Sequence, residues 1–107
     1  MRLRLVPSCA VLLLAVAQAQ SYLPKEGFVP DGRIAAKIAE AVLIPAYGKE
    51  EVESGFAYQA IEETKGVWTV GWSLGCPEAK AETCLGGQAE VKIRQADGRI
   101  LKVVHHD

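Results

Sequence analysis

The sequence predicts an α+β fold in which one N-terminal helix packs on a four-stranded antiparallel meander, as two layers. Three observations support this class. Apolar residues repeat at helical spacing after Asp31, runs of alternating apolar and polar residues follow them, and a turn or loop sequence separates each run from the next. Consecutive strands joined by short turns pair antiparallel. The helix is expected to cover the apolar face of this meander, because an apolar sheet face must be buried against another element.

The first nineteen residues have the features of a cleaved secretory signal peptide. Arg2 and Arg4 form a basic start, an apolar segment follows, and Ala17-Gln18-Ala19 is an A-x-A cleavage site. The apolar segment is too short to span a bilayer permanently, so we expect no stable membrane insertion after cleavage near Ala19–Gln20. The mature protein is therefore expected to be periplasmic or secreted.

The mature chain, residues 20–107, is long enough for one domain with one modest core. It retains ten basic and thirteen acidic residues, a net charge of −3. This balance argues against a nucleic-acid partner, since neutralising phosphates requires a basic face. Residues 20–30 hold two prolines and a glycine and are expected to form an extended lead-in to a single domain spanning 31–107.

Asp31 is expected to N-cap the helix by accepting a hydrogen bond from a backbone N–H of the first turn. One apolar stripe consists of Ile34, Ile38, Ala41 and Val42, and of these Ile34, Ile38 and Val42 are predicted for the core. Pro45 disfavours helical backbone angles at the residue before it, so the helix either ends near Leu43 or kinks there, before Gly48 closes it. The residues from Lys49 to Glu53 are expected to form a short charged connection.

The strands are expected at Gly55–Glu63, Val67–Leu74, Gln88–Gln95 and Arg99–Val104. Val67–Leu74 alternates most clearly, and both of its tryptophans are expected to bury against the helix. The strand residues predicted for the core are Trp68, Val70, Trp72, Val91, Ile93, Leu101 and Val103.

The turn Ala96-Asp97-Gly98 decides the register of the last two strands. A two-residue loop would place Ile93 opposite Lys102 and mix the two faces. A three-residue loop with Gly98 at positive φ pairs Ile93 with Leu101 and Val91 with Val103. The sequence therefore predicts the three-residue loop.

Cys76 and Cys84 lie in the loop Gly75–Gly87 and are expected to form a disulfide, because an isolated pair in an oxidising compartment is most simply bridged. A metal site completed by His105 and His106 is the alternative. A zinc knuckle needs two to four residues between its cysteines, and seven separate these two. We therefore predict no metal and no cofactor.

The sequence offers no catalytic residue on a rigid element. His105, His106 and Asp107 are expected to form a solvated tail, where no side chain is held in place. Glu62 and Glu63, like Glu50 and Glu51, are adjacent carboxylates that point to opposite faces of a strand and cannot share a substrate. Such pairs either keep edge strands from pairing or form an acidic patch for a basic partner. The protein is therefore not expected to be an enzyme.

Six segments in order resemble the nuclear-transport-factor-2-fold immunity proteins of bacterial polymorphic toxin systems. These segments, which fall within residues 29–106, are Ala35–Ala41, Tyr47-Gly48, Val67–Val70, Gly86-Gly87, Asp97–Val103 and His105. Two features depart from the pattern: the loop with Cys76 and Cys84 is longer, and Gly71-Trp72 replaces the usual Thr-Gly. The resemblance implies a reduced, cone-shaped fold with one main helix, and an immunity protein that binds and neutralises a cognate toxin without catalytic residues.

Export makes this expectation more specific. A toxin that an exported immunity protein blocks would attack the cell wall, the membrane or another envelope component. The expected toxin-binding surface is the solvent face of the sheet with the loop Gly75–Gly87, because the helix should cover the other face. The residues on that face are Thr69, Gln88, Glu90, Lys92, Arg94 and Lys102.

Two other function classes fit the same element order. One is a PepSY-like or cystatin-like inhibitor or regulator of an envelope peptidase. The other is an envelope protein with a structural role, or with a small ligand held between the helix and Trp68 and Trp72. The sequence does not decide the oligomeric state.

Overall fold

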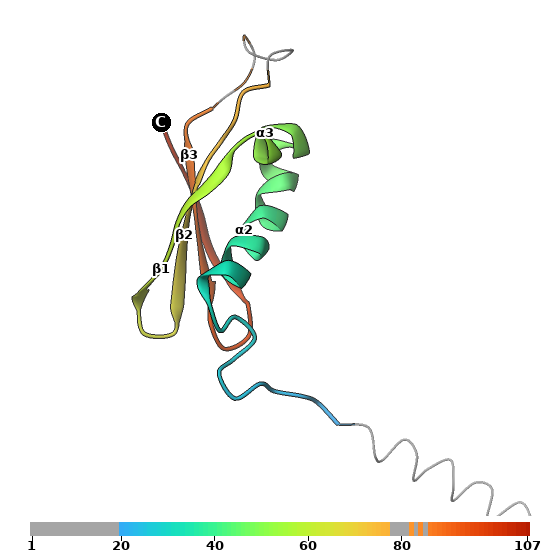
Figure 1. Cartoon of the computed structure of the whole chain (residues 1–107), viewed down its shortest axis with the longest axis vertical. Coiled ribbons are helices and arrows are strands. Elements are labelled where there is room, and N and C mark those ends of the chain that lie inside the picture. The colour runs from blue at the N-terminus through green and yellow to red at the C-terminus, as the bar shows by residue number, and fades with distance from the viewer. Residues whose placement is uncertain (1–19, 78–81, 83, 85) are drawn as a thin grey trace, which may run out of the picture.

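The computed structural model describes residues 20–77, 82, 84 and 86–107. Its elements, in chain order, are the helices α2 (Gly32–Tyr47) and α3 (Lys49–Glu53) and the strands β1 (Phe56–Thr64), β2 (Val67–Ser73), β3 (Gln88–Arg94) and β4 (Ile100–His106). Both helices lie on one face of a four-stranded sheet, which leaves the opposite face open (Figure 1). The predicted α+β class is confirmed. The expected signal peptide lies outside the described residues, among which no helix is long and apolar enough to cross a membrane.

Helix α2 begins at the predicted cap. The Asp31 Oδ1 atom accepts a hydrogen bond of 2.9 Å from the Ile34 backbone N–H. The helix then continues through Pro45 to Tyr47, because a proline so near the C-terminus removes only one of the last backbone hydrogen bonds. Gly48 ends it with a φ of 94°, and its N–H donates to the Ile44 carbonyl at 2.7 Å.

The segment Lys49–Glu53 is a short helix, α3, and not the simple charged connection that the sequence predicts. The physical reason is Val52, which is fully buried between charged neighbours. One helical turn lets Val52 reach the core, and its carbonyl accepts a hydrogen bond of 3.1 Å from Trp72 Nε1–H.

The sheet has the strand order β1-β2-β3-β4 with every pair antiparallel, as the meander prediction requires. Val91 pairs with Val70 on one side and with Val103 on the other. Ile93, however, pairs with Ile100, so the predicted partner Leu101 is wrong. The Arg94 N–H bonds the Arg99 carbonyl at 2.8 Å, so pairing of β3 with β4 starts directly at the turn. A bulge between Lys92 and Ile93 then leaves Leu101 as the extra residue of β4.

The core lies between α2 and the sheet. On the helix it is built from Ala35, Ala39 and Leu43, all fully buried, one residue round from the predicted stripe. Ile34 is 37% exposed, which corrects its assignment to the core, and Ile38 and Val42 are half-buried. The reason is a close approach of helix and sheet: a Cβ atom at Gly32 would lie 3.0 Å from the Ala60 carbonyl oxygen, so only small side chains fit between them. The strand residues of the core are Val70, Trp72, Ala89, Val91 and Ile93, with Trp68 half-buried beside them. Leu74, directly after β2, is buried with them.

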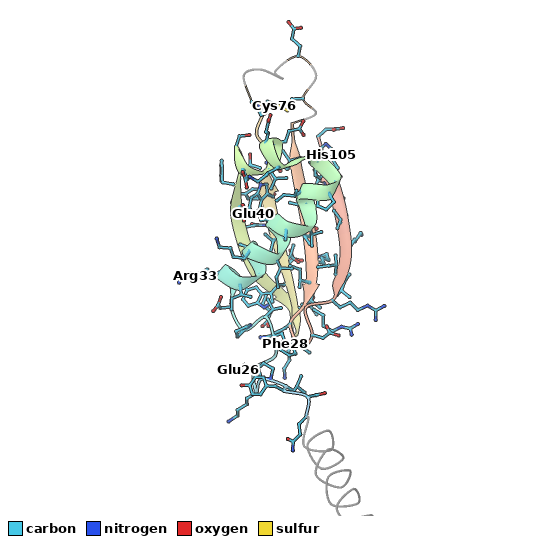
Figure 2. The ribbon with its side chains drawn as sticks, turned by 90° about the vertical axis from the view of Figure 1, so that its right-hand side faces the viewer. Glu26, Phe28, Arg33, Glu40, Cys76 and His105 are labelled. Atoms are coloured by element: carbon cyan, nitrogen blue, oxygen red, sulfur yellow. A yellow bond between two sulfur atoms is a disulfide. The ribbon has the colours of Figure 1, made fainter. Side chains whose placement is uncertain are left out.

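Leu101 and Val103 are each 42% exposed, which corrects their assignment to the core. The cause is the diagonal course of α2, which starts against β1 and β2 and ends beside β4, where Tyr47 meets His105 (Figure 2). One helix cannot cover four strands. The start of β4 is therefore left open on the helix side of the sheet.

The end of the lead-in is docked on the domain. Phe28 and Val29 donate backbone hydrogen bonds to the carbonyls of Ala96 and Gln95, at 3.1 and 3.0 Å. Val29 is fully buried, and its carbonyl accepts a hydrogen bond of 2.8 Å from Trp68 Nε1–H. This segment therefore closes the end of the core beside the β3–β4 turn.

The two histidines belong to β4, which corrects the expectation of a solvated tail. His105 pairs with Ala89, and its Nδ1 atom lies 3.1 Å from the Tyr47 hydroxyl. His106 pairs with Gln88 on the adjacent register position. Pairing with β3 through the last residues of the strand is what holds both side chains in place.

Candidate functional site

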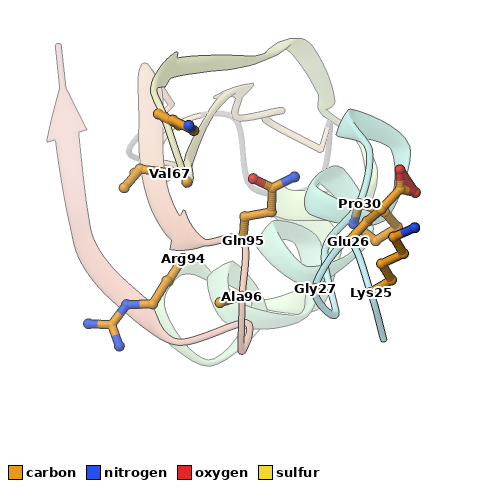
Figure 3. A pocket seen from close by; sticks show the side chains of 10 residues that line it. Lys25, Glu26, Gly27, Pro30, Val67, Arg94, Gln95 and Ala96 are labelled. Atoms are coloured by element: carbon orange, nitrogen blue, oxygen red, sulfur yellow. The ribbon is translucent and has the colours of Figure 1, made fainter. Parts of the chain in front are cut away.

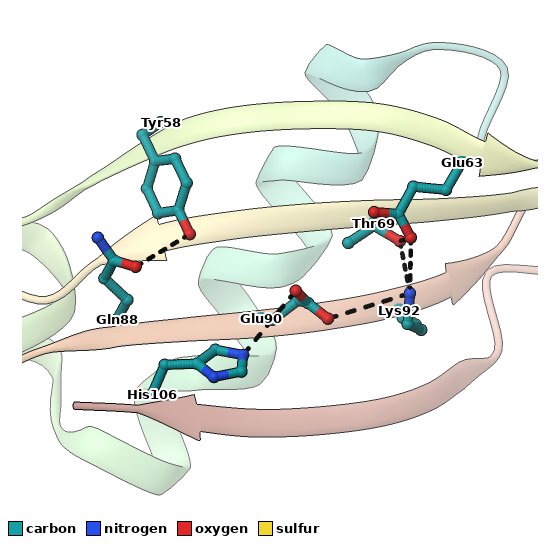
Figure 4. Close-up of polar contacts among 7 residues, drawn as sticks. All are labelled: Tyr58, Glu63, Thr69, Gln88, Glu90, Lys92 and His106. Carbon is teal, nitrogen blue, oxygen red and sulfur yellow. Dashed lines mark hydrogen bonds and ion pairs between the residues drawn. The ribbon is translucent and has the colours of Figure 1, made fainter.

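The sheet face opposite α2, here called the outer face, carries a continuous set of polar side chains (Figure 4). The six residues expected from the sequence to bind a partner all come from the strands of this face. Three of them, Thr69, Lys92 and Glu90, are joined by hydrogen bonds or ion pairs. The arrangement around Lys92 is the centre of the candidate site.

Lys92 is held by three oxygen atoms. Its Nζ atom donates hydrogen bonds of 2.9 Å to Glu63 Oε2 and 2.9 Å to Thr69 Oγ1, and it lies 4.0 Å from Glu90 Oε1. Thr69 is fully buried beneath these side chains, and its hydroxyl donates to Glu63 Oε2 at 3.1 Å. Thr69 can therefore position Lys92 and Glu63, but it cannot itself touch a partner.

On the outer face opposite charges meet along β3, at Glu90 and Lys92, while Lys92 and Lys102 lie opposite each other between β3 and β4. Glu90 lies between Lys92 and His106, whose Nε2 atom is 3.9 Å from Glu90 Oε2. Since the Lys92 side chain is 30% exposed and the Glu90 side chain 28% exposed, both remain within reach of a partner. A partner with complementary charges would meet side chains that are already fixed in place, which lowers the entropy cost of binding.

Two further residues of this face come from irregularities in β1. The β1–β2 register shifts between Ala57 and Gln59 and again between Glu62 and Thr64, so Tyr58 and Glu63 are the extra residues. Tyr58 lies over Gly71 and its hydroxyl donates to Gln88 Oε1 at 3.4 Å. Strict alternation along β1 could not assign these side chains to the outer face, because a bulge changes where a side chain points.

The network changes the acidity of Glu63. The hydrogen bonds from Lys92 and then from Thr69 lower the pKa of the Glu63 carboxyl below its ordinary value of 4.5. Both donors stabilise the ionised form. Glu63 is therefore a carboxylate at neutral pH. From the sequence, Glu62 and Glu63 are expected to protect an edge strand or to form an acidic patch, and the bond from Lys92 to Glu63 was not predicted.

Arg94 and Lys102 complete the expected set. Arg94 Nη1 lies 3.3 Å from Asp97 Oδ2 at the β3–β4 turn, and the backbone N–H of Arg99 lowers the pKa of Asp97. Lys102 pairs with Lys92 in the sheet and is exposed. Among the described residues Lys102 makes no ion pair, so it offers a cation to a partner at no cost in internal contacts.

The predicted disulfide between Cys76 and Cys84 is present, with Cα atoms 5.5 Å apart. It joins the chain that leaves β2 to the chain that approaches β3. The loop Gly75–Gly87, also expected to bind a partner, is described only at residues 75–77, 82, 84, 86 and 87, and the rest of it lies outside the described residues.

An open hollow of about 690 Å³ lies at the other end of the sheet, between the lead-in and the two turns (Figure 3). Lys25 and Glu26 lie on its lead-in side, while the guanidinium of Arg94 extends away from them. The charged groups that line this hollow therefore do not converge on one point. A second, smaller hollow lies between α2 and β1, over Trp72, and is also open.

The described residues contain no group of three or more histidine, cysteine or acidic side chains placed to hold a metal ion. His105 and His106 occupy neighbouring positions of β4, so they face opposite sides of the sheet. His105 contacts Tyr47 on the helix side, where burial raises the pKa of the tyrosine hydroxyl. His106 contacts Glu90 on the outer face. The two histidines therefore cannot act on one substrate together.

The family model described as NTF2 fold immunity protein matches residues 34–107. The match begins in the first turns of α2 and includes α3 and all four strands. Neither a curated protein nor a solved structure matches this chain.

Proposed function

Because the chain belongs to the NTF2-fold immunity protein family, we propose that it is an exported immunity protein that neutralises a cognate toxin by binding it directly. Family membership supports a toxin as the partner in general terms. The proposal adds export, direct binding and the surface that binds. The protein would act by occupying the toxin and would not need a catalytic group of its own.

The outer face is the surface that we assign to the toxin. The observation that carries this assignment is the fixed network around Lys92, in which Thr69 and Glu63 hold the ammonium group while 30% of the Lys92 side chain stays exposed. Charged groups that are complementary across an interface set specificity and speed association. An immunity protein must select one toxin among many, so a fixed pattern of charges suits that task.

Export decides where the toxin would act. The basic start, apolar segment and A-x-A site of residues 1–19 support removal of the mature protein from the cytoplasm. A toxin that attacks nucleic acid acts in the cytoplasm and would not meet it there. We therefore propose that the toxin attacks an envelope component, and a disulfide between Cys76 and Cys84 fits the same oxidising compartment.

Two experiments test the proposal. Tagged mature protein is recovered from the envelope fraction of its own cells, and the proteins that co-purify are identified by mass spectrometry. A stoichiometric partner with a toxin module is expected, whereas a peptidase would instead support an inhibitor of envelope peptidases.

The toxin is then expressed in cells that carry either the full chain or a form without residues 1–19. Only the full chain should rescue growth; rescue by the shortened form would contradict an envelope target.

A further inference from the structure

The two edges of the sheet differ in how well they are protected against pairing. Strand β1 carries two register shifts and the adjacent carboxylates Glu62 and Glu63, and bulges and charges both oppose the addition of another strand. Strand β4 is regular from Lys102 to His106, and Lys102 is the one lysine, arginine or acidic residue in that stretch. The unprotected edge is therefore β4.

The open edge of β4 adjoins the apolar surface that α2 leaves uncovered. Ile100 is 38% exposed, and Leu101 and Val103 are each 42% exposed. Phe28 of the lead-in is a further exposed apolar residue at this end of the domain, 47% exposed, and its backbone N–H bonds the Ala96 carbonyl of the β3–β4 turn. We propose that β4 pairs antiparallel with β4 of a second copy, about a two-fold axis beside Val103.

This register makes the strand complementary to itself. Val103 then faces Val103 of the second copy, which joins two exposed apolar side chains on the helix side of the sheet. Lys102 faces Val104, so no two like charges are opposed. Arg99 of each copy lies near Asp107 of the other, and both side chains are exposed in one copy. An axis beside Lys102 would instead oppose two lysines, which disfavours that register.

The diagonal course of α2 supports the same axis. The helix covers β4 at its His105 end, where Tyr47 packs, and leaves the Ile100 end open (Figure 2). Antiparallel pairing places the covered end of each copy beside the open end of the other. The Tyr47 end of each helix would therefore shield Leu101 of the second copy. The result is an eight-stranded sheet that presents two outer faces side by side.

The test uses the mature protein alone, so it is independent of the toxin. Its mass in solution is measured by sedimentation velocity over a concentration series. We expect a species of twice the protomer mass, and the fraction of the protein in this species should increase with protein concentration. Hydrogen exchange should slow with concentration at amides of β4 and stay unchanged at amides of β1. A single protomer mass at every concentration would overturn the proposal.

A pair of matched variants locates the interface. Val103→Lys places two positive charges at the proposed axis and should give only the protomer mass. Ile61→Lys, at a residue of β1 with nearly the same exposure of 44%, should leave the dimer intact. Circular dichroism checks that both variants are folded. A dimer that survives Val103→Lys, or one that only Ile61→Lys dissociates, would contradict pairing through β4.

Discussion

The two faces of the sheet are built on different principles. On the helix side, Ala35, Ala39 and Leu43 pack against strand residues that exclude water almost completely. On the outer face, Glu63 and Lys92 lie over Thr69 and remain partly exposed. Stability thus comes mainly from one face, while the other can change its polar residues at little cost to the fold. This separation would let an immunity protein adapt to a new toxin without losing its structure.

The largest expected effect lies in the covered face. Leu43→Ala should lower the free energy of unfolding by about 3 kcal/mol, because it removes a fully buried side chain and leaves a cavity. Leu23→Ala is the matched control, since Leu23 is 73% exposed, and it should change the free energy by less than about 0.5 kcal/mol. Urea denaturation measures both. Equal effects of the two substitutions would break the comparison.

The disulfide comes next. Replacing Cys76 and Cys84 together by serine should lower the free energy of unfolding by about 2.5 kcal/mol, because the unfolded chain loses a closed loop. Denaturation of the oxidised protein and of the double variant gives the difference. A double variant as stable as the oxidised protein would show that the bridge does not stabilise the domain.

Two glycines give a sharper version of the comparison. A Cβ atom at Gly55 would overlap the Ser73 backbone carbonyl, whereas a Cβ atom at Gly71 would meet only the ring of Tyr58 on the outer face. The backbone cannot move away, but an exposed side chain can. Gly55→Ala should therefore cost about 2 kcal/mol and Gly71→Ala about 1 kcal/mol or less, by thermal or urea denaturation. A larger cost for Gly71→Ala would mean that the outer face also carries the fold.

The smallest expected effect is a dependence of stability on pH. Hydrogen bonds from Lys92 and Thr69 lower the pKa of Glu63 in the folded protein. The contribution of Glu63 to the free energy of unfolding is therefore complete above its ordinary pKa of 4.5, and it is lost as the pH falls through the lower pKa of the folded protein. Glu63→Gln should remove that part of the acid dependence, and Glu62→Gln should retain it. Unfolding curves from neutral pH down to about pH 3 would reveal it. Identical curves for Glu63→Gln and the unchanged protein would contradict the assignment.

Much of the fold could be predicted from local patterns. Asp31 caps α2 because its side chain can reach the first turn. A positive φ was predicted at Gly98, and the observed φ is 76°. Alternation along Val67–Leu74 placed Val70 and Trp72 on the helix side, where both are buried. These predictions depend on interactions between residues close in sequence.

The errors arose where packing between distant segments decides the outcome. Alanines are as apolar as isoleucines on a helical wheel, so the pattern alone could not show that Ala35 and Ala39, and not Ile34, meet the sheet. Exposure of Leu101 follows from the crossing angle of α2, which no local pattern encodes. The bulges at Tyr58 and Glu63 interrupt the alternation of β1, so two outer-face residues escaped prediction.

The most direct test is the affinity of the co-purified toxin for two triple variants, measured by calorimetry. The first variant replaces Glu90, Lys92 and Arg94 by alanine on the outer face. The second replaces Arg33, Lys37 and Glu40 by alanine on α2, where these residues border the hollow beside β1. The first should weaken binding by about 2 kcal/mol or more, roughly thirty-fold, and the second should leave it nearly unchanged. Unchanged binding by the outer-face variant, or a larger loss from the helix variant, would show that the toxin binds elsewhere.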